Sequence, residues 1–574
     1  MKIQDKTTKI IFNVLAIVCI IIFCFSLTPR TLQNDTYYTI KIGELITNNG
    51  IDMKDHFSWH EDLPYTYPHW AYDTGIYLVY HLGEISGLPD GGMLFVYLST
   101  VVLASILGIS LYYTSQKLTK NKLVSFVISM ACMYLLRDYI AARAQLVTFI
   151  LFVLTILCIE SFLETKKKRY LIAIIAISIA IANIHVAVWP FFFVLFLPYI
   201  AEYIIAAIAE KNLLQRFIVF NKKDVVKTLE KKLAKAKNEE ETSKIQKLIN
   251  EKKEEVAQEE VRFEKIKVRT KELRDNPYKI KVTKNSAVKW LILVMIICAF
   301  TGLLTPLGDT PYTYLIKTMQ GNTTQSISEH LPLTLYNDKS TMIVLVLFLI
   351  ILVFTDTRIK LSDLFMLAGL VYLSFMSRRQ ISLLVLIGGF VFAKLLTSLV
   401  EKYDSDGCRN VTNFMTTILG RTITLAVVII LAFSMYKPKM NNSFVSSSSY
   451  PVDAATWMLE NLDVENIKLF NEYNYGSYLL FRGIPVFIDS RADLYAPEFN
   501  GTKDENGEYK GRDIFSDYIN TSSIGTYYET KFEEYGITHV IVTKNSKLNM
   551  FISKNEKYKE LYNDGKFVIY ERDV

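Results

Sequence analysis

The apolar residues of this chain are gathered into long runs, and this pattern constrains the fold more than any other feature. Hydrophobic residues make up 51% of the 574 positions and charged residues 21%, so the two kinds must be segregated along the chain. A helix needs about 20 apolar residues to cross a bilayer. About eleven runs approach that length: Ile10–Leu27, Met93–Tyr113, Leu123–Leu136, Leu146–Leu163, Leu171–Ala187, Trp189–Ile208, Trp290–Leu304, Met342–Phe354, Leu361–Phe375, Ile381–Leu399 and Ile423–Tyr436. The sequence therefore predicts a polytopic α-helical membrane protein.

Lysine and arginine cluster between alternate runs, which predicts an orientation. The basic segments are Lys2–Lys9, Lys117–Lys122, Lys166–Arg169, Lys211–Lys289, Arg358–Lys360 and Lys402–Arg421. All of them fall on one side if the runs simply alternate across the membrane, and basic loops stay cytoplasmic. We expect an integral plasma-membrane protein with its N-terminus inside and its C-terminal region outside. The net charge of +7 then reports topology and gives little reason to expect a nucleic-acid partner.

Composition divides the chain into four regions. A first membrane region, 1–210, contains a long outer loop at 29–92; a charged segment, 211–289, interrupts the spans; a second membrane region covers 290–436; and 437–574 is a soluble outer domain. Within the charged segment, apolar residues recur at helical spacing over Asp224–Arg274, with a turn expected at Asn238–Thr242. This pattern predicts a cytoplasmic helical hairpin, a scaffold or a docking arm for a protein partner.

The C-terminal region reads as a small α/β domain behind the linker Asn441–Ser449. We expect a helix at Val452–Leu462 and strands at four places: Ile467–Phe470, Val486–Ile488, His539–Val542 and Phe567–Tyr570. Asp489, Arg491 and Asp493 follow the second expected strand. They are either saccharide ligands or a structural salt-bridge cluster, and the second interpretation is favoured.

Three arginines break the rule that places basic residues inside. Arg143, Arg378 and Arg379 stand in tight connections on the expected outer side. An arginine near hydrocarbon costs free energy, so three at one level indicate an anionic partner there, and guanidinium groups bind phosphate bidentately. The alternatives are contact with lipid headgroups or pairing with Asp138.

Other polar residues are expected at the same outer level. Asp35 opens the long loop just after the first run, where a carboxylate suits chemistry at the membrane surface; the alternative is a carboxylate that caps a helix. Apolar spacing after Asp35 predicts an amphipathic helix on the outer leaflet. His185 and Glu329 also fall at this level, His185 alternatively as a packing residue. Asp55, His56 and His69 are potential metal ligands whose spacing matches no recognised site, so a divalent metal stays open.

The sequence lacks the motifs that a disulfide framework or a nucleotide-binding site requires. The chain contains no CxxC pair, no GxGxxG and no P-loop followed by a helix, and Gly91-Gly92 only precedes an apolar run. Neither a disulfide framework nor a nucleotide-sugar fold is therefore expected.

Several short motifs, in this order, resemble bacterial multispan glycosyltransferases of the GT-C superfamily, among them relatives of the protein mannosyltransferases. In the first outer loop they are Asp35-Thr36-Tyr37-Tyr38, Ile42-Gly43-Glu44, Asp55-His56-Phe57-Ser58 and His69-Trp70. In the membrane region they are Ala142-Arg143-Ala144-Gln145, Ala182-Asn183-Ile184-His185, Thr305-Pro306-Leu307-Gly308, Ile327-Ser328-Glu329-His330 and Ser377-Arg378-Arg379-Gln380. Near the C-terminus they are Pro451-Val452-Asp453-Ala454, Tyr475-Gly476-Ser477-Tyr478 and Phe487-Ile488-Asp489-Ser490-Arg491.

This resemblance implies transfer of a sugar from a polyprenyl-phosphate carrier to a glycan or protein acceptor at the outer membrane face. By resemblance, Asp35 is the general base, Arg143, Arg378 and Arg379 bind the donor phosphate, and the supporting residues are Glu44, His69, His185 and Glu329. Thr39 and Thr305 depart from the His and Asn expected at those places.

Two other functions stay open. A transporter or flippase of a lipid-linked saccharide also needs phosphate-binding arginines, but it is expected to carry polar groups at mid-membrane and internal repeats. A noncatalytic scaffold subunit would not depend on Asp35. The sequence specifies neither the sugar, the acceptor nor the stereochemistry of transfer.

Overall fold

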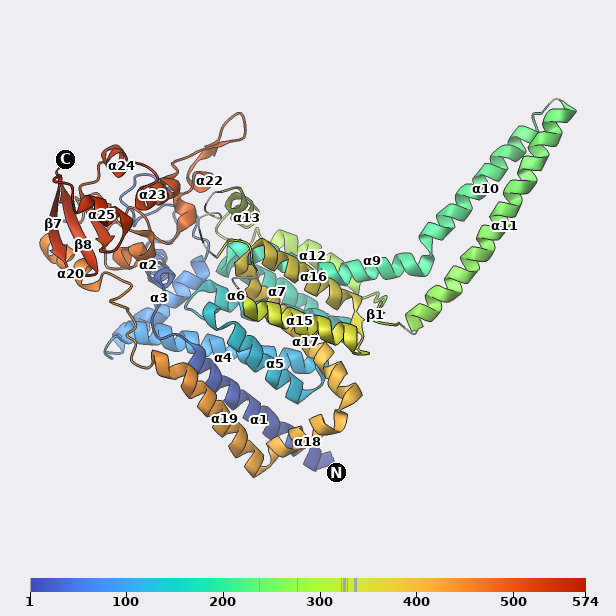
Figure 1. The fold of residues 1–574 in the computed structure, drawn as a ribbon, viewed down its shortest axis with the longest axis horizontal. Coiled ribbons are helices and arrows are strands. Elements are labelled where there is room, and N and C mark those ends of the chain that lie inside the picture. The colour runs from blue at the N-terminus through green and yellow to red at the C-terminus, as the bar shows by residue number, and fades with distance from the viewer. Residues whose placement is uncertain are drawn as a thin grey trace.

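The structure is a computed structural model that describes residues 2–573 apart from 237, 276, 322, 324–326, 328 and 335–337. Most of the chain is helical. A bundle of roughly parallel helices carries a mixed α/β domain at one end, and two long helices project from the other (Figure 1).

Six helical segments in the described residues are long and apolar enough to cross a membrane. They are Thr7–Leu27 in α1 (Lys2–Leu27), α4 (Gly91–Thr119), α6 (Ala144–Thr165), Val186–Glu210 across η2 (Val186–Val188), α8 (Trp189–Val194) and α9 (Leu197–Lys211), Arg378–Tyr403 across η3 (Arg378–Gln380) and α17 (Ile381–Tyr403), and Ile418–Lys439 in α19 (Ile418–Tyr436) and η4 (Lys437–Lys439). Five shorter apolar helices accompany them: α5 (Lys122–Leu135), α7 (Arg169–Ile184), α12 (Val288–Thr301), α15 (Lys339–Phe354) and α16 (Leu361–Met376). The predicted mostly helical fold is confirmed, and the six long apolar helices agree with a multi-pass membrane protein. The eleven runs are all helical, but five of them fall short of the length of a full span.

Helix α1 has one buried apolar side and one exposed apolar side. In α1, Phe12, Cys19 and Cys24 are buried against the bundle, whereas Val14 and Ile21 on another side are 55% and 41% exposed. Apolar residues on every side are what a helix needs when one face packs on protein and another meets hydrocarbon.

A buried ion triad joins three of these helices. Nζ of Lys394 on α17 lies 2.8 Å from Oε1 of Glu160 on α6 and 2.8 Å from Oδ1 of Asp363 on α16. Tyr199 donates its hydroxyl to the same Glu160 oxygen over 3.1 Å. Buried charges persist only when they are paired in this way, so the triad fixes how the helices pack.

The helix that contains Asp35 is α2 (Asn34–Asn49), and its surroundings correct one prediction. It does not lie on the outer leaflet but packs between α3 (Trp70–Ile85) and α21 (Tyr473–Phe481). Tyr37, Ile40 and Ile42 are each at most 1% exposed although they point in different directions around the helix. A helix that is apolar on several sides is buried by protein on several sides.

The α/β domain is built on a four-stranded sheet of order β3-β6-β8-β7, in which only β3 and β6 are parallel. The strands are β3 (Leu469–Phe470), β6 (His539–Thr543), β7 (Tyr558–Asn563) and β8 (Phe567–Arg572). Around them lie α20 (Val452–Asn461), α21, η5 (Ala492–Tyr495), α22 (Pro497–Asn500), α23 (Ile514–Ser523), α24 (Tyr528–Tyr535) and α25 (Lys547–Ile552), and the short pair β4 (Thr502–Lys503) and β5 (Tyr509–Lys510). The predicted mixed domain is therefore present, with β7 as a strand that the sequence pattern missed.

The expected strand Val486–Ile488 is wrong, because its backbone pairs elsewhere. The Phe57 carbonyl accepts from Val486 N over 3.2 Å, and Val486 O accepts from Trp59 N over 3.3 Å. The Asn471 side chain accepts a hydrogen bond from Phe487 N through Oδ1 and donates one to Ile488 O through Nδ2. The segment is thus tied to the first outer loop and to a side-chain amide.

The projecting arm consists of α10 (Leu213–Leu233) and α11 (Glu239–Asp275) (Figure 1). Val226 and Ile249 are buried between the two helices, and Lys253 of α11 pairs with Glu230 of α10 at 2.8 Å. Since α11 already begins at Glu239, the predicted turn at Asn238–Thr242 is placed too late. At its base β1 (Ile280–Lys281) pairs in parallel with β2 (Ile359–Lys360). The remaining described helices are η1 (Arg137–Tyr139), α13 (Thr310–Gln320) and α18 (Ser405–Thr416).

Candidate active site

Asp35 and Arg143 form an ion pair at the end of the bundle that carries the α/β domain. An Nη atom of Arg143 donates to Oδ2 of Asp35, and the two side chains are 30% and 17% exposed. A second Nη of Arg143 lies 4.0 Å from Oε1 of Glu329. Three of the predicted site residues therefore meet around one guanidinium.

Local structure explains why the pair forms. Asp35 stands in the first turn of α2, where the helix dipole favours a carboxylate. Arg143 has extended backbone and directly precedes α6. The Thr36 hydroxyl donates to Ala142 O over 3.3 Å, which joins the start of α2 to the residue before Arg143.

The two remaining arginines lie in the tight connection between α16 and α17. Backbone hydrogen bonds bind this connection to the segment of Glu329: Arg379 N donates to Glu329 O over 3.0 Å, and Arg378 N donates to Leu331 O over 2.9 Å. Glu329 is thus held beside both arginines. Ser328, part of the same predicted motif, lies outside the described residues.

A cavity of about 540 Å³ opens beside these groups. Its basic lining residues are Arg137, Arg143, Lys339, Arg378 and Arg379, and its acidic ones are Asp138, Glu329 and Asp338. The excess of basic over acidic groups suits an anionic ligand, and the volume is within the range of ligand pockets. Asp138, the alternative partner of the three outer arginines, lies 3.7 Å from a fourth arginine, Arg137.

His69 and His185 lie together next to this site. Their ring centroids are 4.7 Å apart, and Nδ1 of His185 is 3.1 Å from the Thr148 hydroxyl. Burial, together with the nearby charge of Arg379, lowers the pKa of His69 to about 3. His69 is therefore neutral at physiological pH and acts through hydrogen bonding or packing.

The structure does not bring Glu44 to the cavity. Its Oε2 lies 2.5 Å from Lys41 Nζ on the same helix, and its charge faces the tyrosines of α3.

Thr39, where the resemblance predicted a histidine, donates its hydroxyl to Asp35 O over 2.8 Å. Thr305 stays close to the backbone, where its hydroxyl accepts from Leu307 N over 3.4 Å.

Asp73 is a fully buried carboxyl in α3. Neither of its side-chain oxygens has a hydrogen-bond partner within the part of the chain that the structure describes. Burial raises its pKa well above the usual value of 3.8, which favours the protonated form. Gly43 makes this close approach of α2 and α3 possible, because a Cβ there would lie 2.0 Å from Asp73 O.

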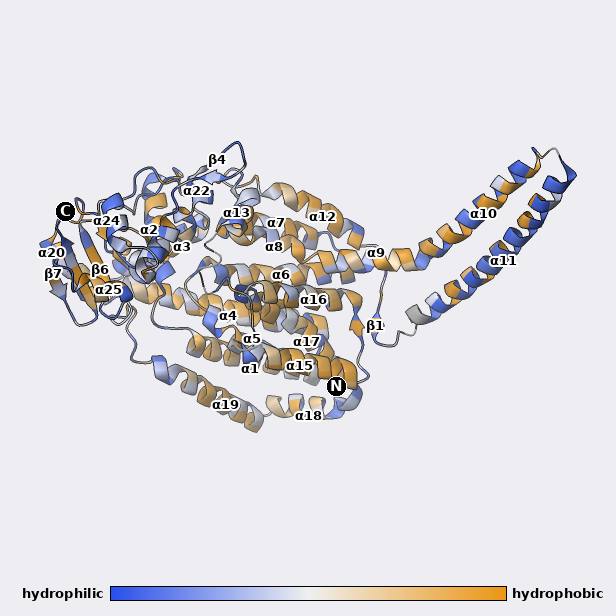
Figure 2. Ribbon diagram, turned by 45° about the horizontal axis from the view of Figure 1, so that its top comes forward, coloured by the Kyte–Doolittle hydropathy of each residue, from blue (hydrophilic) through white to orange (hydrophobic). Residues whose placement is uncertain are grey.

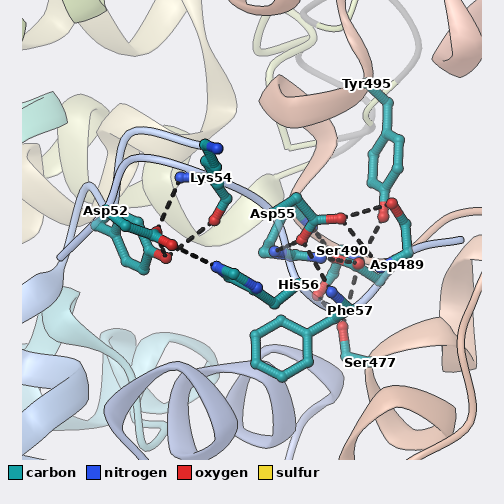
Figure 3. Close-up of polar contacts among 12 residues, drawn as sticks. Asp52, Lys54, Asp55, His56, Phe57, Ser477, Asp489, Ser490 and Tyr495 are labelled. Atoms are coloured by element: carbon teal, nitrogen blue, oxygen red, sulfur yellow. Dashed lines mark hydrogen bonds and ion pairs between the residues drawn. The ribbon is translucent and has the colours of Figure 1, made fainter. Parts of the chain in front are cut away.

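Arg491 joins the first outer loop to the α/β domain. Its Nη atoms lie 2.6 Å from Asp55 and 2.7 Å from Asp489, and all three side chains are at most 3% exposed. Asp489 also accepts the Tyr495 hydroxyl over 2.6 Å (Figure 3). With their charges paired and their surface covered, Asp489 and Arg491 have the character of a structural salt bridge. Asp493, expected in the same cluster, instead accepts the Tyr314 hydroxyl.

Asp55, His56 and His69, the potential metal ligands, do not converge on one point. Asp55 pairs with Arg491, His56 lies 2.6 Å from Asp52, and His69 meets the ring of His185 edge to face, so the three potential ligands have separate partners. Within the part of the chain that the structure describes, no group of three or more His, Cys, Asp or Glu is placed to hold a metal ion. Asp35 faces a guanidinium, whose positive charge would repel a metal ion.

Sequence reasoning missed the part of the site that other segments supply. Tyr473 O of α21 accepts from Asn34 Nδ2 over 3.1 Å, which places the α/β domain beside Asp35. Asp493 accepts the Tyr314 hydroxyl and lies within electrostatic reach of Arg379. Arg137 lines the cavity, and its position in the same outer connection as Arg143 was a usable signal.

Comparison with known proteins supports the fold. No protein-family profile and no curated protein matches the sequence. The chain is similar to the apo oligosaccharyltransferase of Archaeoglobus fulgidus, with a TM-score of 0.52 and 12% identity over 93% of this chain and 69% of that one. It also resembles the same organism's AglB in complex with an inhibitory peptide and a dolichol-phosphate: the TM-score is 0.53 and the identity 11%, over 98% and 74% of the chains. The chain thus shares its overall fold with this archaeal oligosaccharyltransferase.

Proposed function

We propose that this protein is a membrane glycosyltransferase that moves a sugar from a polyprenyl-phosphate carrier to an acceptor at the outer membrane face. The observation that carries the proposal is the Asp35–Arg143 ion pair beside an arginine-rich cavity at the end of an apolar helix bundle. A carrier of this kind has its isoprenoid tail in the bilayer and its phosphate at the bundle end. The archaeal relative in fold was solved with a dolichol-phosphate, which agrees with this class of donor.

In the proposed reaction Asp35 is the general base. It accepts the proton of an acceptor hydroxyl or amide as the acceptor atom attacks the anomeric carbon of the sugar. The bond between that carbon and the phosphate oxygen breaks, and the lipid phosphate leaves with the electron pair. Arg143, Arg378 and Arg379 stabilise the negative charge that develops on this phosphate.

The neighbouring groups have positioning roles. Glu329 lies 4.0 Å from Arg143 and orients the guanidinium that Asp35 also holds. His69 and His185 form a neutral pair that borders the donor phosphate site. Glu44, although the resemblance suggested a supporting role, is assigned none in this mechanism because it pairs with Lys41.

Asp35→Asn tests the proposal. The amide keeps the size of the side chain but loses its basicity, so transfer in proteoliposomes should fall by about 10²–10⁴-fold while donor binding changes little. Asp52→Asn is the matched control, since Asp52 lies in the same loop but pairs with His56 at the surface. Donors are supplied as a panel of polyprenyl-phosphate sugars, chosen by comparing surface glycans of cells with and without the protein.

Near-full turnover of a folded, inserted Asp35→Asn protein would contradict the catalytic assignment. Uptake or flipping of a lipid-linked saccharide by that variant would then support a transporter. Loss of surface glycan only when the whole protein is deleted would indicate a scaffold.

A further inference from the structure

A second cavity, of about 600 Å³, lies at the base of the α10–α11 arm. Ile205, Ala206 and Ala209 of α9 form one wall, and Tyr278 and Ile280 from the chain after α11 form another. The elements that line it, α9, α11 and β1, lie at the end of the bundle opposite the α/β domain (Figure 1). This cavity is therefore separate from the proposed active site.

The position of this cavity along the bundle corresponds to a membrane surface. Its α9 wall is the last part of the apolar segment Val186–Glu210, whose 25 residues are enough to cross a bilayer. Lipid headgroups lie where such a segment leaves the hydrocarbon. A cavity at this level with apolar walls is open to a lipid from the adjacent leaflet.

Charge at the cavity favours an anionic occupant. Four lysines line it against one acidic residue: Lys267, Lys271, Lys279, Lys284 and Glu210. Lys284 pairs with Glu210, and Lys279 donates to Thr355 O. Lys267 and Lys271, one helical turn apart on α11, are both exposed. Lys267 also pairs with Glu264 of the same helix at 3.2 Å, so a phosphate that binds there replaces this exposed carboxylate.

The first turns of α10 give an independent indication of membrane contact. Leu214, Phe217 and Phe220, spaced by three residues, are 74%, 61% and 66% exposed. The apolar residues of the arm gather near its base, while its tip is hydrophilic (Figure 2). Large exposed apolar side chains beside lysines are typical of a helix at a membrane interface.

We propose that the base of the arm binds an anionic phospholipid of the adjacent leaflet. The acyl chains lie along the apolar α9 wall, and the phosphate is held by Lys267 and Lys271. A zwitterionic lipid fits the same wall but gains less from the lysines. The arm is thereby fixed at its base and free to extend from the membrane at its tip.

Native mass spectrometry of the full chain in nanodiscs of equal phosphatidylglycerol and phosphatidylcholine tests this proposal. The wild type should retain phosphatidylglycerol preferentially, and the double variant Lys267→Gln, Lys271→Gln should lose about tenfold or more of that preference. Lys244→Gln with Lys247→Gln makes the same charge change near the arm tip and should retain it. Equal retention of the two lipids by the wild type, or an unchanged preference in the first variant, would overturn the proposal.

A fluorescent probe tests the contact separately from headgroup selectivity. An environment-sensitive dye on Phe217→Cys should report an apolar surrounding in phosphatidylglycerol nanodiscs, whereas the same dye on Leu248→Cys, farther along the arm, should report water. Cys408 is replaced by serine in both proteins, because the other native cysteines are buried. Aqueous emission from both positions would overturn the membrane contact.

Discussion

Asp35 is held by the guanidinium of Arg143, and this determines what a substitution at the site reveals. Removing the carboxylate leaves Arg143 close to Glu329, whereas removing the guanidinium leaves a half-buried carboxylate without its partner. A buried charge that has lost its partner destabilises the fold more than the removal of both charges does. The Asp35→Asn variant is consequently the cleaner probe of catalysis.

Arg379→Ala should weaken donor binding and leave the chemical step less affected. One charge-assisted hydrogen bond to phosphate contributes about 1.5–3 kcal/mol, equivalent to a roughly 10- to 100-fold rise in the donor Kd. Binding of a fluorescent polyprenyl phosphate to the purified protein measures it. Arg409→Ala, in an exposed ion pair on α18, should bind as the wild type does. An unchanged Kd for Arg379→Ala would remove this residue from the phosphate site.

Asp55→Asn should loosen the α/β domain from the outer loop. The substitution leaves Arg491 with one buried partner fewer, at a cost of about 3–5 kcal/mol. Burial raises the pKa of Asp55, but Arg491 and Ser58 lower it to below the usual 3.8. The stabilisation is therefore present above pH 3.8 and lost as pH falls through the folded pKa. Thermal unfolding should show this acid dependence in the wild type and in Asp62→Asn, and not in Asp55→Asn.

Among the elements, α17 carries a constraint that hydropathy alone does not show. Lys394 places a charge inside an apolar span, and α6 and α16 must each supply a carboxylate to it. Packing of these helices is thereby specified by one geometry as well as by apolar contact.

Lys394→Met should destabilise the bundle by about 3–5 kcal/mol, since two carboxylates lose their common cation. Thermal unfolding in detergent measures the loss. Adding Glu160→Gln and Asp363→Asn should restore most of it, and Lys402→Met, at an exposed pair, should have little effect. No recovery in the triple variant would show that the ion triad is not the cause.

Deleting Asp224–Arg274 and joining the ends with a flexible linker should leave insertion and sugar transfer largely intact. The arm helices pack mainly on each other, and the proposed active site lies at the other end of the bundle. The same deletion should abolish the preference for phosphatidylglycerol, because Lys267 and Lys271 are removed. Complete loss of transfer in a stable, inserted protein would assign the arm a role in catalysis.

At the scale of the whole molecule, the arm and the α/β domain stand at opposite ends of the bundle (Figure 1). This separation agrees with the distribution of basic loops, which predicts that one end is cytoplasmic and the other external. Reporter fusions after Lys289 should be cytoplasmic, and fusions after Tyr450 should be external. An external reporter after Lys289 would invert the proposed side of catalysis.

The sequence by itself determined the features that depend on local composition. Apolar runs long enough for helices, alternating charge in the arm and basic loops on one side are all properties of neighbouring residues. The arginines at one membrane level also followed from the order of the spans, and the structure brings Arg143, Arg378 and Arg379 to one cavity.

Only the tertiary structure decided the contacts between distant segments. Arg491 and Asp55 are 436 positions apart, Val486 pairs with the outer loop, and α2 is enclosed between α3 and α21. Glu44 does not reach the site because its position on α2 directs its side chain toward Lys41 and α3. Periodicity is a local signal that reports how a segment is solvated, whereas a buried ion pair or an enclosed helix depends on which other segment packs against it.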